Sequence, residues 1–424
     1  MSDCLPDGVQ AALKAAWTQR ASLLAALIRA ARGDFVAAEE ALSQALEAAT
    51  AVWPRDGVPD SPEGWLVSAG RLALLRQASR AAQSLETSDP DGKLWGGAVA
   101  PVEGEVVLDN LIDFGGDDDQ LRLVFTCCHP ALAPAARVAL TLNAVCGLEA
   151  HAISRAFLVE EATLAQRLVR AKRKIRDAGI PFRAPTSAEL GERLPEVLKT
   201  IELIFNEGYA CTRGRDLISE RLCDEAIQLA SSLARLLPDE TEPMGLLAML
   251  FLTDARREAR VSEGGDLVTL PEQDRRLWDQ RKVVAGRSLL AQAVQLGGDG
   301  PLVLRAALAA EHSTAASAED TRWARIVELY DALLVIEPSP VVALNRATAV
   351  GEASGPQAML TAVEAIEDPG GALASSHYRL AVIGEAQRRM GRTLEARASF
   401  EAASQLAEND MERRHLLRRA EACF

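Results

Sequence analysis

The chain has 424 residues, of which 48% are hydrophobic and 25% are charged, and this balance excludes a disordered chain. At about 100 to 200 residues per domain, the length is enough for two or three domains. The formal net charge of -14 argues against nucleic-acid binding by the chain as a whole.

The cellular location and the fold class follow from what the sequence contains and lacks. No uncharged apolar run approaches the roughly 18 residues of a membrane span, and the acidic start differs from a basic secretory signal. Seven scattered cysteines without a CxxC pair indicate reduced thiols. We therefore expect a cytoplasmic protein without membrane contact. Abundant alanine and leucine, with only 4% aromatic residues, predict an all-α fold.

The first predicted domain covers residues 1–85. Apolar residues recur there at helical spacing from Val9 to about Ala82. Three prolines and a glycine within residues 53–62 predict a break, and Ser61 followed by Pro62 predicts the start of a third helix.

Charge is segregated along the rest of the chain. Residues 86–119 carry ten acidic side chains, with Lys93 as the only base, and predict an acidic linker. The net charges of residues 1–120, 121–183 and 184–424 are -10, +6 and -10. One short cationic segment therefore lies in an acidic chain, as a local contact with a polyanion would require.

The cationic segment, within a second predicted domain of residues 120–183, has the spacing of a helix-turn-helix. Gly147 is expected to end one helix, and a short helix over 149–157 and a basic helix over 161–176 follow. An apolar stripe is predicted at Leu164, Leu168, Ala171 and Ile175. The opposite, acid-free arc holds the candidate DNA-binding residues Thr163, Gln166, Arg167, Arg170, Arg173 and Lys174. We expect its N-terminal end to read bases and its later cations to bind phosphates.

The last predicted domain, residues 184–424, is almost wholly helical. Residues 330–338 are echoed by residues 400–408, and a helix at 356–367 falls where an intervening copy is expected. The pattern predicts tetratricopeptide-like helix pairs. Such a stack is either purely structural or forms a concave binding surface, and the sequence leaves both open.

The sequence contains no recognisable catalytic or metal-binding motif. Cys127, Cys128 and His129 are adjacent, but no second pair supplies the other ligands of a tetrahedral zinc site. The other histidines are isolated and the Gly-Gly pairs lack a phosphate-loop context. We therefore expect no enzyme, no metal and no cofactor.

Three segments together resemble a known family: residues 121–132, residues 156–159 with 162–175, and Ile204-Phe205-Asn206-Glu207-Gly208-Tyr209. They are similar to extracytoplasmic-function sigma factors of bacterial RNA polymerase, in the subgroup with a tetratricopeptide-like C-terminal extension. The resemblance implies that residues 1–85 bind core RNA polymerase and open the minus-10 element of promoter DNA. It implies that residues 120–183 read the minus-35 element, and that the linker runs through the polymerase cleft.

The resemblance also assigns residues in the first domain. Asp34, Glu39, Glu40 and Gln44 resemble the polymerase-binding helix, where acids along one exposed arc would meet basic side chains. In the third helix the family has a dense arginine run, whereas this chain retains the minus-10 candidates Arg71, Arg76 and Arg80. Fewer phosphate contacts weaken duplex binding, so this departure bears most on minus-10 recognition.

Three functions are weighed on these grounds. The leading hypothesis is a sigma factor with a regulatory C-terminal repeat domain, which packs against the helix-turn-helix and is needed for activity. The alternative is a sigma-derived interaction scaffold that binds polymerase or other proteins without melting promoters. A hydrolytic enzyme using Cys127, Cys128 or His129 lacks a nucleophile pair or metal. The repeat domain is expected to contact a protein partner or another part of this chain.

Overall fold

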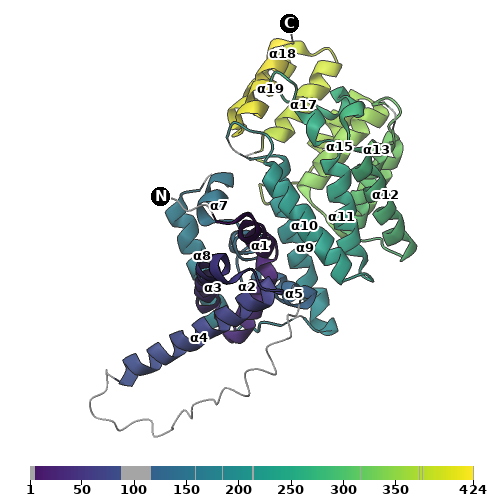
Figure 1. Ribbon diagram of the computed structural model, residues 1–424. Helices are drawn as coiled ribbons and strands as arrows, with labels where there is room; N and C mark the ends of the chain where they lie inside the picture. Colours follow the sequence, from purple (N-terminus) through teal and green to yellow (C-terminus); the bar gives the residue numbers. More distant parts are fainter. Residues whose placement is uncertain are drawn as a thin grey trace. The chain divides into compact units, whose positions relative to one another are not determined.

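The computed structural model describes residues 5–86, 116–157, 159–183, 185–212, 214–315, 317–371, 373–374 and 376–423. Within these ranges the fold is all-α, as predicted, and the only β-structure is two isolated bridges, Gly214 with Asn409 and Val261 with Leu267 (Figure 1). No helix in these ranges is both long and apolar enough to span a bilayer. Packing divides the chain into one compact unit of residues 1–155 and 159–200 and another of residues 156–158 and 201–424.

Among the described residues, the first unit contains two groups of four helices and the beginning of the helix that follows them. The first group is α1 (Asp7–Thr18), α2 (Arg20–Ala30), α3 (Phe35–Asp56) and α4 (Pro62–Glu86). The second group is α5 (Gly116–Cys127), α6 (Pro134–Ala144), α7 (Ala150–Ala156) and α8 (Glu161–Asp177). Helix α2 packs against α3, α4 and α5, so it contacts both groups. The buried core includes Leu24 and Ile28 of α2, Trp53 of α3 and Phe125 of α5.

Side-chain caps mark the starts of two helices in this unit. Asp34 caps α3 by accepting hydrogen bonds from the backbone amides of Val36 and Ala37, and Ser61 accepts one from Gly64 at the start of α4. Two boundaries differ from expectation. Helix α3 continues through Pro54 to Asp56, because a proline in the last turn removes only one helical hydrogen bond. Helix α5 begins at Gly116, inside the predicted linker, of which residues 87–115 lie outside the described residues.

The border between the two units falls within one helix, α9 (Ser187–Tyr209). Its residues up to Thr200 belong to the first unit, whereas the predicted border at 183/184 lies in the turn before the helix. Arg193 of α9 donates a hydrogen bond to the carbonyl oxygen of Phe125 at 2.8 Å, and Glu196 pairs with Arg137 of α6. The helix therefore contributes side chains to both units.

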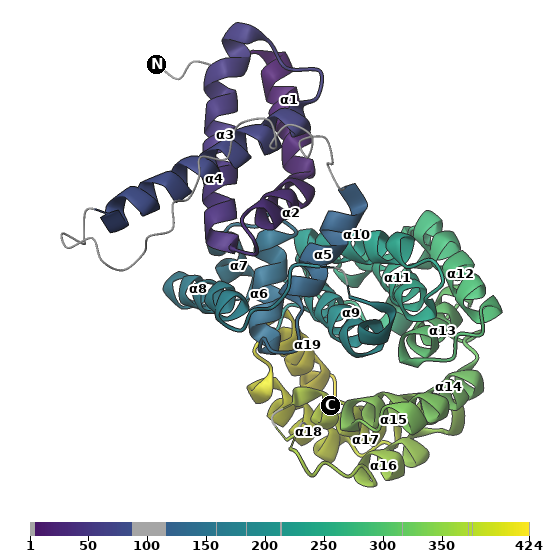
Figure 2. The ribbon, with the colours of Figure 1, turned by 90° about the horizontal axis from the view of Figure 1, so that it is seen from below.

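The second unit is a continuous series of antiparallel helices (Figure 2). After α9 come α10 (Glu220–Leu236), α11 (Thr241–Asp254), α12 (Gln280–Gln295), α13 (Pro301–Thr314), α14 (Trp323–Ile336) and α15 (Pro340–Ser354). The series ends with α16 (Pro356–Glu364), α17 (His377–Arg389), α18 (Thr393–Leu406) and α19 (Asp410–Glu421). Three short 3-10 helices, Arg257–Arg260, Leu270–Glu272 and Arg275–Leu277, lie between α11 and α12.

The internal repeat is visible as helix pairs. Helices α14, α16 and α18 occupy the three positions at which the sequence predicted copies, and each is followed by a partner helix. Close approach is built in at Gly351 of α15, because a Cβ atom there would meet the side chain of Met359 at 2.1 Å. Such packing of each pair on the next makes a continuous core, as expected of a repeat stack.

The last helix returns to the beginning of the second unit. Asn409, which is fully buried, donates hydrogen bonds to the carbonyl oxygens of Cys211 and Asp216 at 3.0 Å, and its side-chain oxygen caps α19. The backbone amide of Asp410 donates to Gly214 at 3.0 Å. The C-terminal helix is therefore tied to the loop that follows α9.

Candidate nucleic-acid interface

Helices α7 and α8 form the predicted helix-turn-helix. Gly147, with φ of 71°, ends the segment after α6 in the left-handed conformation that the sequence predicted. Asn143 stabilises this turn by donating to the carbonyl oxygen of Leu148 at 3.0 Å. The bounds of α7 and α8 lie within two residues of the predicted short and long helices.

Helix α8 has one buried and one exposed face. The predicted stripe of Leu164, Leu168, Ala171 and Ile175 is buried, and α8 packs against α6. On the opposite arc, Thr163, Gln166, Arg170, Arg173 and Lys174 are exposed and Arg167 is half-buried. Five of these six side chains make no hydrogen bond or ion pair to the described residues, and the sixth, Arg173, pairs with Asp177 at 3.1 Å. The structure thus presents the predicted cations to solvent.

The acidic residues of α3 are engaged to different degrees. Asp34 caps the helix, so its carboxylate is occupied by backbone amides. Glu39 forms an ion pair with Lys172 of α8, at 2.6 and 2.7 Å between Lys172 Nζ and the two carboxylate oxygens. Glu40 is exposed and accepts a hydrogen bond from Gln44 at 3.3 Å. The expected exposed acidic arc is therefore reduced, because two of its carboxylates have intramolecular partners.

Lys172 and Arg20 join the two helix groups. The side chains of Lys172 and Glu39 are only 11% and 24% exposed, and Lys172 also donates to Asn143 Oδ1 at 3.2 Å. Arg20 of α2 donates to the carbonyl oxygens of Asn143 and Ala144, both at 3.1 Å, at the C-terminal end of α6. A cation at this end of a helix is favourable. Burial lowers the pKa of Arg20, and the charge of Glu39 opposes this shift.

The minus-10 candidates do not form one arginine face. Arg71 is half-buried, whereas Arg76 and Arg80 are exposed further along α4. At about 100° per residue, Arg76 and Arg80 share one side of the helix and Arg71 lies well away from them. Leu72 and Leu75 are 48% and 53% exposed on the same helix. The exposed surface of α4 is therefore more apolar than a dense arginine run would make it.

The cysteine and histidine motif lies at a core turn. Cys127 and Cys128 are buried, and burial raises the pKa of both thiols. Cys128 Sγ lies 3.4 Å from the hydroxyl of Thr141, and His129 Nδ1 accepts a hydrogen bond from the amide of Ala131 at 3.1 Å. Among the described residues, no three His, Cys, Asp or Glu side chains are arranged to hold a metal ion. The contacts of this motif are those of packing.

The Ile204–Tyr209 motif has a packing role in the second unit. Tyr209 stacks on Phe205 with ring centroids 5.4 Å apart, and the Arg260 guanidinium lies 4.0 Å from the Tyr209 ring centroid. A Cβ atom at Gly208 would lie 2.8 Å from the backbone nitrogen of Cys223, so only glycine allows this approach of α10. No pattern in the sequence predicted Arg260 as the partner of Tyr209.

Lys172, Asn143 and Arg20 were missed by the sequence analysis. Lys172 lies between the apolar stripe and the outer arc of α8, so helical periodicity assigns it to neither face. Its partner Glu39 is 133 residues away in the chain. The only sequence feature that could have indicated this ion pair is the position of Lys172 beside the apolar stripe of α8.

Comparisons with known proteins give one close relative and one family model. The chain is 41% identical over 393 residues to the "Uncharacterized protein R00370" of Rhizobium meliloti (strain 1021), covering 93% of this chain and 91% of that protein. Residues 193–294 match a model described as a family of unknown function, DUF6596. No solved structure matches the chain.

Proposed function

The chain belongs to the same family as the Rhizobium meliloti protein R00370, which it matches over nearly its whole length, and we propose that it acts as a promoter-specificity subunit of RNA polymerase. In this proposal it is a sigma factor of the extracytoplasmic-function type. The observation that carries the proposal is the outer arc of α8. Five exposed polar or basic side chains and the half-buried Arg167 lie on the second helix of a helix-turn-helix.

The arc divides into two parts by its chemistry. Thr163, Gln166 and Arg167 lie near the N-terminal end of α8, which in helix-turn-helix proteins contacts base edges in the major groove. Arg170, Arg173 and Lys174 follow on the exposed face and are suited to phosphates. The pairing of Arg173 with Asp177 is solvent-exposed on both sides, so exchange for a phosphate costs little.

Contact with core polymerase through α3 would use Glu40 and Gln44 first. Glu40 is exposed and Gln44 is half-buried, whereas Asp34 caps the helix and Glu39 forms an ion pair with Lys172. The exposed Leu72 and Leu75 of α4 add apolar area to the same helix group. The second unit is proposed to regulate the first, and the α9 residues up to Thr200 that pack within the first unit support such a connection.

The alternative is an interaction scaffold that binds polymerase without melting promoters. Two observations favour it: the minus-10 candidates are few and spread around α4, and Glu39 is engaged within the chain. Run-off transcription with purified core polymerase and a promoter library distinguishes the two functions. Promoter-specific transcripts support the sigma factor, whereas core binding without transcripts supports the scaffold.

The matched control for this experiment is a variant with Arg170, Arg173 and Lys174 changed to Ala. All three side chains are exposed, so the variant should fold like the parent chain. The proposal predicts that it loses promoter-specific transcription and retains binding to core polymerase. Full transcription by this variant would rule out the proposed role of α8.

A further inference from the structure

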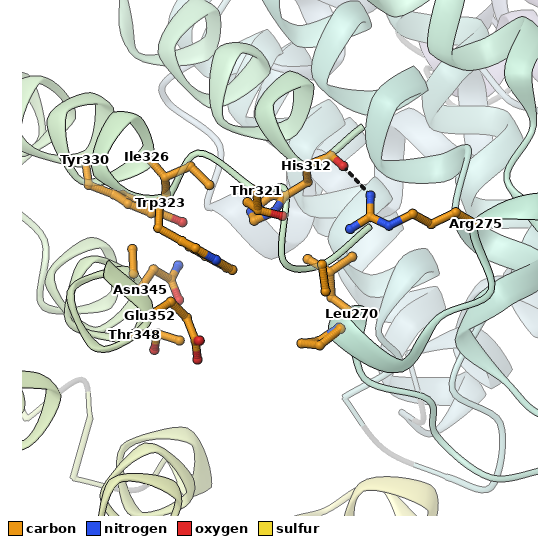
Figure 3. Close-up of a pocket in the computed structure, with 13 residues that line it drawn as sticks. Leu270, Arg275, His312, Thr321, Trp323, Ile326, Tyr330, Asn345, Thr348 and Glu352 are labelled. Carbon is orange, nitrogen blue, oxygen red and sulfur yellow. Dashed lines mark hydrogen bonds between the residues drawn. The ribbon is translucent and has the colours of Figure 1, made fainter. Parts of the chain in front are cut away.

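A pocket of about 220 Å³ lies in the second unit (Figure 3). One wall is a face of α14 and another is a face of α15. The rest comes from α13, from the segment between α13 and α14, and from the 3-10 helices before α12. The lining residues used below are Leu270, Arg275, His312, Trp323, Tyr330, Asn345 and Glu352. Drug-sized ligands occupy roughly 300 to 1,000 Å³, so this pocket suits a smaller molecule.

Part of the pocket wall is aromatic, and its aromatic side chains are neutral. Trp323 is held edge-to-face against His312, with ring centroids 5.4 Å apart, and Figure 3 shows Trp323 and Tyr330 lining the same side. Burial, together with the charges of Arg256 and Arg275, lowers the pKa of His312 to about 4, so its imidazole is neutral. Burial raises the pKa of Tyr330 to about 12. Flat apolar surfaces with neutral polar groups suit an aromatic ring.

Arg275 is the cation that lines this pocket, and it forms no ion pair with the described residues. Its Nη1 donates to the carbonyl oxygens of His312 and Ala315 at 2.7 and 2.9 Å, and it lies 4.6 Å from the Trp278 ring centroid. These contacts fix the guanidinium. No carboxylate of the described residues pairs with it, and the charges of Asp320 and Glu319 act on it from beyond ion-pair distance. A partly buried guanidinium in this situation favours an incoming anion, above all a carboxylate.

The other charge at the pocket is already neutralised. Glu352 pairs with Arg389 of α17 at 2.7 Å. Asn345 is exposed at the pocket and makes no side-chain hydrogen bond to the described residues. Its amide offers both a donor and an acceptor to a ligand. The pocket thus combines an aromatic wall, one unpaired cation and one free amide.

We propose that this pocket binds an aromatic carboxylate of about the size of an amino acid. The ring lies against Trp323 and Tyr330, and the carboxylate faces Arg275, with Asn345 as a further hydrogen-bonding group. Two sources share this chemistry: a free aromatic acid and the C-terminal residue of a peptide. The site concerns the second unit alone and does not depend on the proposed role of α8.

Isothermal titration calorimetry of the full-length chain tests the site with 3-phenylpropionate and with a short peptide ending in phenylalanine. The neutral partners of these probes are 3-phenylpropionamide and the C-terminally amidated peptide. We expect at least one acid to bind at least about tenfold more tightly than its amide. Binding by the free acid identifies a small-molecule site, and binding by the peptide alone identifies a C-terminus site. Both outcomes support the proposal.

Two substitutions in the pocket and one outside it test whether the probes bind at this site. Asn345→Asp adds a negative charge there and Trp323→Leu removes the ring surface, and each should weaken binding at least about tenfold. Val335→Ala, an 85% exposed position on α14 outside the pocket, should bind as the parent chain does. The proposal is overturned if neither acid binds at about 10 mM, if the amides bind equally well, or if both pocket variants bind normally.

Discussion

The sequence predicted an exposed charged arc on each of two helices of the first unit, acidic on α3 and basic on α8. The structure leaves these two arcs exposed to different degrees. On α8 the six candidate residues face solvent or nearly so, and within the part of the chain that the structure describes only Arg173 of these six has an intramolecular partner. On α3, Asp34 caps the helix and Glu39 pairs with a lysine of α8. The difference shows that a charged arc is available to an outside partner only where no neighbouring helix lies within reach of it.

The inner face of α8 offers the largest expected effect. Leu168→Ala removes a buried side chain, 6% exposed, and should lower the free energy of unfolding by about 2 to 5 kcal/mol. Arg170→Ala, on the exposed face, should change it by less than about 0.5 kcal/mol. Urea unfolding of the full-length chain measures the free energy of unfolding of each variant, from the unfolding transition that Leu168→Ala shifts. Equal effects of the two changes would contradict the assignment of the faces.

The ion pair between α3 and α8 comes next. Lys172→Met leaves the Glu39 carboxylate partly buried without its cation, and we expect a loss of about 2 kcal/mol in the free energy of unfolding. Lys174→Met is the matched control, because this lysine is exposed and unpaired among the described residues. Adding Glu39→Gln to Lys172→Met should recover part of the loss. Lys172→Met and Lys174→Met behaving alike would show that the pair contributes nothing.

Loss of a base contact should have a smaller energetic effect than loss of the ion pair, and it should change which promoters are preferred. Changing Gln166 or Arg167 to Ala should alter the preferred minus-35 sequence, with a discrimination of about 1 kcal/mol or more lost at one base pair. Selection from a randomised minus-35 library with core polymerase measures the preference. Unchanged selectivity in both variants would remove the N-terminal end of α8 from the reading role.

Phosphate contacts give the smallest effect and the most uniform one. Neutralising Arg170, Arg173 or Lys174 singly should weaken binding to all promoters alike and reduce the salt slope of binding by about one unit. Fluorescence anisotropy of the polymerase complex over a range of salt concentrations measures the slope. A loss confined to certain promoter sequences, with an unchanged slope, would assign the residue to bases.

Much of the fold was predictable because it depends on local spacing. The buried stripe of Leu164, Leu168, Ala171 and Ile175, the left-handed Gly147 and the helices at the repeat positions all agree with the sequence analysis. Each of these features is set by residues within a few positions along the chain, where helical periodicity and capping preferences act.

The contacts that sequence analysis missed are all made over long distances in the chain. Glu39 and Lys172 are 133 residues apart, and Asn409 reaches loops almost 200 residues before it. The pocket is lined by Leu270 and Arg275 of the 3-10 helices together with residues of α14 and α15, which follow much later in the chain. Periodicity shows which face of a helix is apolar, but it does not show which helix covers that face.

The proposed DNA-reading role of α8 is tested most directly by locating this helix in a complex of core polymerase, this chain and promoter DNA. A photo-crosslinking amino acid replaces Arg170, and Val335 of the second unit carries it in the control. The account predicts crosslinks from position 170 to DNA at the minus-35 element and none to that element from position 335. Crosslinks from position 170 to protein alone, in a complex that initiates transcription, would contradict it.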